Sequence, residues 1–215
     1  MVVPILLALG VTTWRLGHVW ESSETLWRHA ASGGPDRVIP RVNYGINLQV
    51  RADRLEREGK AAEAATVLDE AIRYYQEAAQ LRPIDGRPWY PLGNALKKKG
   101  DQAGAEHAFR QAAKYMTQSY MPLVNLATML EADPARRDEA LQLFREAVDS
   151  VEHPRPGSKP AGTPYLALGL ALKNRGDIPG AIAAFQRARE IAIQTGDTGC
   201  REQAEGRLAQ LNAGR

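Results

Sequence analysis

The sequence holds a single cysteine and few aromatic residues. Cys200 is the only thiol in 215 residues, so no disulfide can form within the chain, and disulfide-stapled scaffolds are excluded. Phenylalanine, tryptophan and tyrosine make up 7% of the residues, and runs of β-branched residues are few. Leucine and alanine are abundant instead, and the hydrophobic content of 44% is ordinary for a soluble globular protein. This composition favours an all-helical chain.

A surplus of one charge sign is also missing. The formal net charge is +3, with acidic and basic residues interspersed, so the chain has no electrostatic footprint for nucleic acid. The densest basic run is Lys97-Lys98-Lys99, at the end of a predicted helix. Cations suit the negative end of a helix dipole, so we interpret this run as structural rather than as a phosphate-binding patch. No nucleic-acid partner is predicted.

The motifs that usually carry enzyme chemistry are absent as well. The four histidines are scattered, and none pairs with a cysteine, histidine or acidic residue at metal-site spacing. The sequence has neither a G-x-x-x-x-G-K-[ST] phosphate loop nor a G-x-S-x-G elbow. We therefore predict a protein that is not an enzyme, with no catalytic residue, no metal site and no cofactor.

What the sequence does have is a recurring pattern of small and aromatic residues. One copy runs Trp89, Leu92, Gly93, Leu96, Ala105, Phe109 and Ala112; another runs Tyr165, Leu168, Gly169, Leu172, Ala181, Phe185 and Ala188. In both, 16 residues separate the opening aromatic residue from the first alanine. Fixed self-similarity with a period of about 20–50 residues is typical of a stacked solenoid. Such an architecture favours binding over catalysis.

This pattern resembles the tetratricopeptide repeat, a helix-turn-helix unit of about 34 residues. Further copies align with it over residues 22–195, through Trp27, Ala30 and Pro35, Ala71, Tyr75, Ala78 and Pro83, and Leu126, Ala127, Ala140 and Phe144. The resemblance implies an all-α fold: a right-handed α-solenoid of stacked helix-turn-helix hairpins closed by a C-terminal capping helix. We predict an apolar segment over 1–21, a half unit over 22–37, full units over 38–85, 86–119, 120–161 and 162–195, and a cap with its tail over 196–215.

Turn residues fall where such hairpins need them. Gly100-Asp101 and Gly176-Asp177 lie between the two predicted helices of their units, and glycine accepts the left-handed conformation that ends a helix. The capping helix is predicted over 201–212, with Cys200 in the turn region before it.

The first full unit is longer than the others. Gly45 and the turn glycine Gly59 are 14 residues apart, whereas Gly93 and Gly100 are only 7 apart. The second helix is lengthened equally, so the hairpin keeps its register and gains about two turns in each helix. Its charged tip over 54–60 is either a solvated surface or a docking prong.

A second departure is an insertion over residues 149–160. Three prolines and a glycine in this stretch argue against regular helix. We predict a surface linker between the third and fourth units, without chemistry of its own.

The N-terminal 13 residues are almost wholly apolar. This run is shorter than the roughly 20 residues that span a bilayer, and no basic residue precedes it as in a signal peptide. Three interpretations stay open: the end of a membrane helix, a short amphiphilic anchor, or the first helix of the incomplete unit, packed on Leu26 and Trp27. An exposed apolar run would be a liability in water, which favours a membrane-associated N-terminus.

A second resemblance concerns this N-terminal stretch. An apolar helix end followed by Trp14, Trp20, Trp27 and a repeat array is similar to a junction in polytopic membrane glycosyltransferases of the O-mannosyltransferase type. In those enzymes it joins the last membrane helix to a tetratricopeptide domain. The resemblance implies an array on the extracytoplasmic side of a membrane; a cytoplasmic location is the alternative. The family's catalytic acidic residues lie in its membrane-embedded part, so none is carried over.

The tetratricopeptide resemblance also implies where a partner binds. In this family the first helices of the units line a concave groove, which places there Arg87, Tyr90, Asn94, Lys97, Asn125, Thr128 and Lys173. Apolar additions are Ile46, Val124, Leu166 and Leu170. Members that clamp a C-terminal carboxylate use a Lys/Asn set, which Asn94 and Asn125 match and Tyr90 does not. Packing between repeats is the alternative role for these side chains.

The sequence thus predicts a non-catalytic scaffold that holds a protein or peptide in its concave groove, near a membrane. The alternative is the soluble accessory region of a membrane glycosyltransferase that uses a lipid-phosphate sugar donor and whose catalytic part lies outside this chain.

Overall fold

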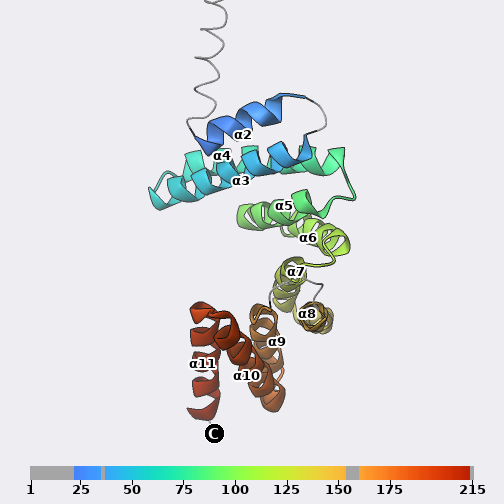
Figure 1. Ribbon diagram of the computed structural model, residues 1–215, viewed down its shortest axis with the longest axis vertical. Helices are drawn as coiled ribbons and strands as arrows, with labels where there is room; N and C mark the ends of the chain where they lie inside the picture. The colour runs from blue at the N-terminus through green and yellow to red at the C-terminus, as the bar shows by residue number, and fades with distance from the viewer. Residues whose placement is uncertain (1–21, 35–36, 154–159, 214–215) are drawn as a thin grey trace, which may run out of the picture. The chain divides into compact units, whose positions relative to one another are not determined.

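A computed structural model describes residues 22–34, 37–153 and 160–213. Within these ranges the chain forms α-helices joined by short turns, with one 3-10 turn and no β-strand (Figure 1). The prediction of an all-α fold is confirmed. The chain divides into two compact units, Met1–Ala108 and Phe109–Arg215. The boundaries predicted for the individual repeats stay a prediction.

Most of the described helices pair into antiparallel hairpins. The N-terminal helices are, in chain order, α2 (Ser23–Ser32), α3 (Val38–Arg57), α4 (Ala61–Leu81), α5 (Gly86–Lys99) and α6 (Gln102–Tyr115). The C-terminal ones are α7 (Met121–Glu131), η1 (Pro134–Arg136), α8 (Arg137–Glu152), α9 (Thr163–Asn174), α10 (Ile178–Thr195) and α11 (Thr198–Ala213). Partners within a hairpin are in contact: α3 with α4, α7 with α8, and α9 with α10.

The two predicted Gly-Asp turns have the same construction. Gly100 ends α5 with a φ of +91°, and Gly176 follows α9 with a φ of +81°, conformations that other residues rarely adopt. The next residue then caps the second helix of the hairpin. The carboxylate of Asp101 accepts a hydrogen bond from the backbone N–H of Gly104, and that of Asp177 from Gly180, both at 2.9 Å. Local sequence therefore determines where each of these hairpins reverses.

The first full hairpin is lengthened as predicted. Helices α3 and α4 contain 20 and 21 residues, whereas α5 and α6 contain 14 each. Apolar side chains at helical spacing hold α3 against α4: Leu48 and Tyr75 are fully buried, and the Tyr75 hydroxyl donates to Gln49 Oε1 at 3.2 Å. Burial raises the pKa of the Tyr75 phenol, with a smaller effect of the Asp53 charge. This shift reflects core packing.

The lysines at the end of α5 bind the sides of the long hairpin. The Lys98 ammonium contacts the carboxylate of Asp53 and, at 2.6 Å, that of Glu56, both on α3. Lys99 contacts Asp69 of α4 at 2.7 Å. The hydrogen bonds that the Lys98 ammonium donates to Asp53 and Glu56 raise the pKa of Lys98 above its usual value. Two of the three lysines are therefore tied to neighbouring helices, which agrees with a structural role for the run.

We expect Lys98→Met to destabilise the protein by about 0.5–1 kcal/mol at pH 7, because it removes two ion pairs at a side chain that is 30% exposed. The folded-state pKa of Lys98 is raised, so the contribution is complete below pH 10 or so and disappears as the pH rises through that pKa. Urea denaturation at pH 7 and pH 11.5 measures both effects. The matched control is Lys97→Met, on the neighbouring exposed residue; equal losses in the two variants would contradict the assignment.

Helix α2 begins with a capping box. The Ser22 hydroxyl accepts a hydrogen bond from the Thr25 N–H at 3.1 Å, and the Thr25 hydroxyl accepts one from the Ser22 N–H at 3.2 Å. The helix packs against α3, with Ala31 buried and Glu24 paired with Arg51 at 3.3 Å. This is the second helix predicted for the incomplete first unit.

In the second compact unit, Phe109–Arg215, the core surrounds the aromatic residue of the repeat pattern. Phe185 of α10 is fully buried, and Tyr165, Ala181, Ala188 and Ile191 belong to the same cluster. The hydroxyl of Tyr165 donates to Glu152 Oε1 at 2.6 Å, which links α9 to the end of α8. The small and aromatic residues of the repeat pattern thus form the interface along which α9 and α10 pack.

The final helix begins earlier than the sequence predicts. Helix α11 starts at Thr198 rather than at residue 201, so Cys200 lies in its first turn and is 5% exposed. The cause is a cap: the Asp197 carboxylate accepts a hydrogen bond from the Cys200 N–H at 2.9 Å. Burial, followed by the Asp197 charge, raises the pKa of the Cys200 thiol. Cys200, Ala204 and Leu211 pack against the α9–α10 cluster, as a capping helix should.

The predicted linker over 149–160 is partly helical. Helix α8 continues through Glu152, and His153, with a φ of −112° and a ψ of 60°, ends it. A proline drives the residue before it out of the helical region, so His153 leaves the helix and α8 ends at Glu152, four residues later than predicted. Residues 154–159 of the predicted linker lie outside the described ranges.

The three interpretations of the apolar N-terminal segment concern residues 1–21, which also lie outside the described ranges. Among the helices that the structure does describe, none combines the length and the apolar character needed to cross a membrane.

Candidate functional site

Four of the predicted groove residues share one face of α5. Arg87, Tyr90, Asn94 and Lys97 recur at steps of three and four residues, and Leu92 and Leu96 on the opposite side are buried. Arg87 and Lys97 are exposed, and Tyr90 and Asn94 are half-buried. The face presents a ring, an amide and two cations to the outside of the first unit.

Arg87 also has a structural partner that sequence reasoning missed. Its guanidinium binds the carboxylate of Asp85, with Nη2 2.6 Å from Oδ2, and the same carboxylate accepts the Arg87 N–H at 3.0 Å. These hydrogen bonds lower the pKa of Asp85. Asp85 is the N-cap of α5, so Arg87 is held at the start of the helix. Its side chain is still 55% exposed.

Helix α3 carries an apolar stripe that the sequence analysis identified only at Ile46. Ile39, Ile46 and Val50 are 50%, 44% and 61% exposed. Their spacing of seven and four residues places them on one side of the helix, and a fuller helical-wheel reading of 38–57 would have found them. Asn43 and Asn47 follow the same side, where the Asn47 amide donates to the Asn43 carbonyl at 2.9 Å.

A shallow pocket of about 240 Å³ continues this stripe toward α2. Its lining consists of Ser22, Ser23, Glu24, Asn47, Val50, Arg51 and Arg54. The apolar stripe of α3 therefore adjoins hydroxyl, amide and guanidinium groups within the first unit.

The remaining groove residues belong to the second unit. Asn125 and Thr128 lie on α7, and Lys173 lies near the end of α9. The Thr128 hydroxyl donates to the Val124 carbonyl at 2.7 Å, so its proton is used within the helix. Among the predicted apolar additions, Leu166 is 8% exposed and belongs to the α9–α10 core. For Leu166 the structure agrees with the alternative role, packing between helices, because this position of α9 packs inward.

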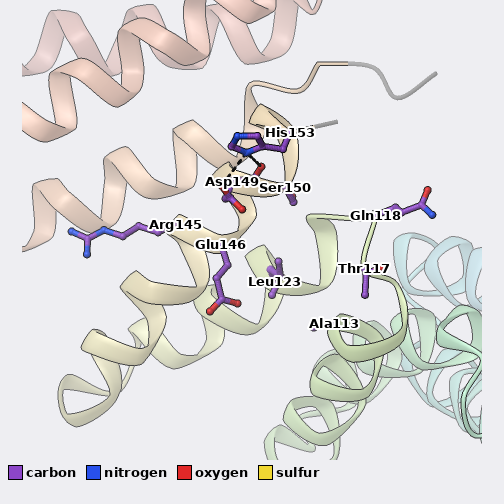
Figure 2. A pocket seen from close by; sticks show the side chains of 9 residues that line it. All are labelled: Ala113, Thr117, Gln118, Leu123, Arg145, Glu146, Asp149, Ser150 and His153. Carbon is purple, nitrogen blue, oxygen red and sulfur yellow. Dashed lines mark hydrogen bonds and ion pairs between the residues drawn. The ribbon is translucent and has the colours of Figure 1, made fainter. Parts of the chain in front are cut away.

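The second unit also contains a larger pocket between α6, α7 and α8 (Figure 2). Its volume is about 620 Å³, and its lining consists of Ala113, Thr117, Gln118, Leu123, Arg145, Glu146, Asp149, Ser150 and His153. Four lining residues of α8 and its C-cap His153 recur at three- and four-residue steps, so one face of that helix forms a wall. His153 Nδ1 lies 3.1 Å from Asp149 Oδ1. Sequence reasoning treated residues 149–153 as linker and so did not predict this pocket.

Among the residues that the structure describes, no group of three or more His, Cys, Asp or Glu side chains is placed to hold a metal ion. The raised pKa values of Tyr75 and Cys200 arise from burial in helix-packing cores.

Comparison with known proteins agrees with this geometry. The chain is 31% identical over 141 residues to the TPR repeat-containing protein PA4299 of Pseudomonas aeruginosa, an alignment covering 60% of this chain and 53% of the relative. The solved structure of MamA superposes with a TM-score of 0.58 at 16% identity, covering 85% of this chain and 94% of MamA. The chain has the tetratricopeptide-repeat fold.

This repeat chain spans about half the length of its curated relative. It also resembles a chain of the anaphase-promoting complex heterotetramer Cut9–Hcn1, with a TM-score of 0.55 and 14% identity over 88% of this chain and 36% of the other. No protein-family model matches the sequence. At such identities the solved structures establish the shared fold of the tetratricopeptide array and nothing about its ligand.

Proposed function

We propose that this chain is a non-catalytic scaffold that binds an extended, acidic peptide segment of a partner protein. The peptide would lie on α3 and α5, the first helices of their hairpins. The observation that supports it most strongly is the exposed face of the first unit. There the apolar stripe of α3, Ile39, Ile46 and Val50, lies on the helix that packs beside α5, and α5 presents Tyr90 and Asn94. Apolar side chains flanked by amides suit a peptide held through both its backbone and its side chains.

The charges of the two helices favour an acidic peptide. Helices α3 and α5 carry a surplus of basic residues: Arg41, Arg51, Arg54, Arg57, Arg87, Lys97, Lys98 and Lys99, against only Asp53 and Glu56. Both acidic side chains are engaged by Lys98. Five of the basic side chains pair with acids outside the two helices, namely Arg41, Arg51, Arg54, Arg87 and Lys99. Lys97 is exposed, and no ion pair joins it to another residue of the described ranges. A partner carrying carboxylates would therefore meet a complementary surface.

The test begins with 12-residue peptides selected from a random library on the full-length chain. Tyr90→Ala with Asn94→Ala is expected to weaken their binding about tenfold or more, with an unchanged helical circular dichroism spectrum. The matched control is Gln76→Ala with Gln80→Ala, two exposed residues of the second helix α4. Titration calorimetry measures the affinities. Unchanged binding by the Tyr90/Asn94 variant would contradict the groove assignment.

A membrane-associated N-terminus and a link to a membrane glycosyltransferase stay predictions from the sequence. The apolar segment on which both depend lies outside the described ranges, and the similar proteins reported above do not bear on either. The reading frame upstream of Met1 tests the glycosyltransferase link: an open frame that encodes many apolar spans would support it, and a stop codon with a ribosome site would remove it.

A further inference from the structure

Helix α8 forms one wall of the pocket between α6, α7 and α8, and only some of its acidic residues have partners on other elements. Helix α8 carries five acidic residues, and three of them have partners elsewhere. Glu139 binds Arg110 at 2.5 Å and Arg136 at 2.8 Å, Asp138 binds Arg175 at 2.8 Å, and Glu152 accepts the Tyr165 hydroxyl at 2.6 Å. The two that remain, Glu146 and Asp149, are the two that line the pocket.

Neither of these carboxylates is neutralised by a strong cation. Glu146 is exposed and forms no ion pair within the described ranges, and Asp149 pairs only with the exposed His153 of its own helix. Arg145 also lines the pocket, but in Figure 2 its side chain extends away from Leu123 and Thr117. The wall therefore carries two carboxylates against one arginine, and no ion pair within the described ranges joins that arginine to either carboxylate.

The rest of the lining is suited to the stem of a long side chain. Ala113 of α6 and Leu123 of α7 supply an apolar surface opposite α8. Polar acceptors surround it: Thr117 and Gln118 follow α6, and the Ser150 hydroxyl, which donates to the Ala147 carbonyl at 2.7 Å, keeps its lone pairs available. Lysine and arginine combine an aliphatic stem with a cationic head in the same way.

We propose that this pocket is a second binding site, formed largely by the second helices α6 and α8, for a lysine or arginine side chain of a partner protein. The stem lies on Ala113 and Leu123, and the cationic head binds Glu146 and Asp149. A volume of about 620 Å³ falls within the common range for ligand sites, roughly 300–1,000 Å³, and admits the backbone on either side of that residue as well. This site and the acidic-peptide face of α3 and α5 have opposite charge preferences, so each is testable without the other.

The test is an NMR titration of the full-length chain with three probes that differ only in the side-chain head. Nα-acetyl-lysine methylamide and Nα-acetyl-arginine methylamide are the cationic probes, and Nα-acetyl-norleucine methylamide has the stem without the charge. Saturable shifts are expected at the backbone amides of Ala113, Leu123, Glu146 and Asp149 with at least one cationic probe. Norleucine is expected to bind about tenfold more weakly, because it lacks the charge-assisted hydrogen bonds.

Variants then separate a specific site from general attraction. Glu146→Gln with Asp149→Asn is expected to abolish the saturable shifts, whereas Glu202→Gln with Glu205→Gln, the same charge change on exposed positions of α11, leaves them unchanged. Ala113→Leu narrows the pocket with its charges intact and is also expected to weaken binding. Equal binding of norleucine, retained binding in the Glu146/Asp149 variant, or no saturable shift with either cationic probe would each overturn the proposal.

Discussion

Replacing Phe185 with alanine is expected to lower the free energy of unfolding by about 3–5 kcal/mol. The Phe185 ring is fully buried between α9 and α10, where it lies directly against Gly169. Alanine would leave a cavity in the cluster that joins these helices to α11. Because a repeat array is stabilised mainly by contacts between neighbours, the loss should be concentrated in the second unit. Urea denaturation followed by far-ultraviolet circular dichroism measures it.

Tryptophan fluorescence supplies an internal comparison, because all four tryptophans lie in residues 1–108. In the Phe185→Ala variant the fluorescence midpoint should therefore shift less than the circular dichroism midpoint. Ile193→Ala is the matched control on the same helix, since Ile193 is 59% exposed and its truncation leaves no cavity. A loss in Phe185→Ala no larger than in Ile193→Ala would refute the assignment of Phe185 to the core.

The parts of the fold that could be predicted from sequence are those fixed by local chemistry. The aromatic and alanine positions recur at helical spacing, so they predicted both the helices and their buried seams, as at Phe109 and Phe185. Gly100 and Gly176 predicted the turns because few other residues adopt a positive φ. The extra length of α3 followed from the spacing between Gly45 and Gly59, and that of α4 from the spacing between Gly59 and Ala71.

The errors arise where a helix end depends on a single contact. Nothing in composition distinguishes Asp197 as an N-cap, and that cap moves the start of α11 to Thr198 and buries Cys200. Similarly, prolines in the 149–160 stretch suggested a linker throughout, although a proline constrains only itself and the residue before it. Helix α8 therefore reaches Glu152, and this extension supplies Asp149 and Ser150 to the pocket.

The candidate sites were predicted less completely than the fold because they depend on which side chains remain available. Arg87 was assigned to ligand binding from its position on the helix, but its guanidinium also binds Asp85, the N-cap two residues earlier. Leu166 shares the register of Tyr90, yet it is buried by the last hairpin. The charge of the α8 wall follows from which acids find partners on other helices, and a linear sequence does not specify those partners.

Replacing Gly45 with alanine is expected to lower the free energy of unfolding by about 1–3 kcal/mol, although alanine is the better helix former. A Cβ placed on Gly45 would lie 2.5 Å from Cε1 of Tyr75. That ring is fully buried and its hydroxyl is bonded to Gln49, so the ring has no space to retreat. Helix propensity gains less than about 1 kcal/mol, so the clash decides the sign of the effect.

The matched control is the same substitution at Gly206 of α11, where nothing lies within 4 Å of an added Cβ. Gly206→Ala is expected to stabilise the chain by about 0.5–1 kcal/mol, since only the backbone-entropy term remains. Thermal denaturation of both variants measures the opposite signs. Tyr75→Leu provides the final check: it removes the ring that the new methyl group meets, so Gly45→Ala should cost less in the Tyr75→Leu background than in the wild-type chain. Additive losses in this double-mutant cycle would show that the close approach of α3 and α4 at Gly45 does not depend on the Tyr75 ring.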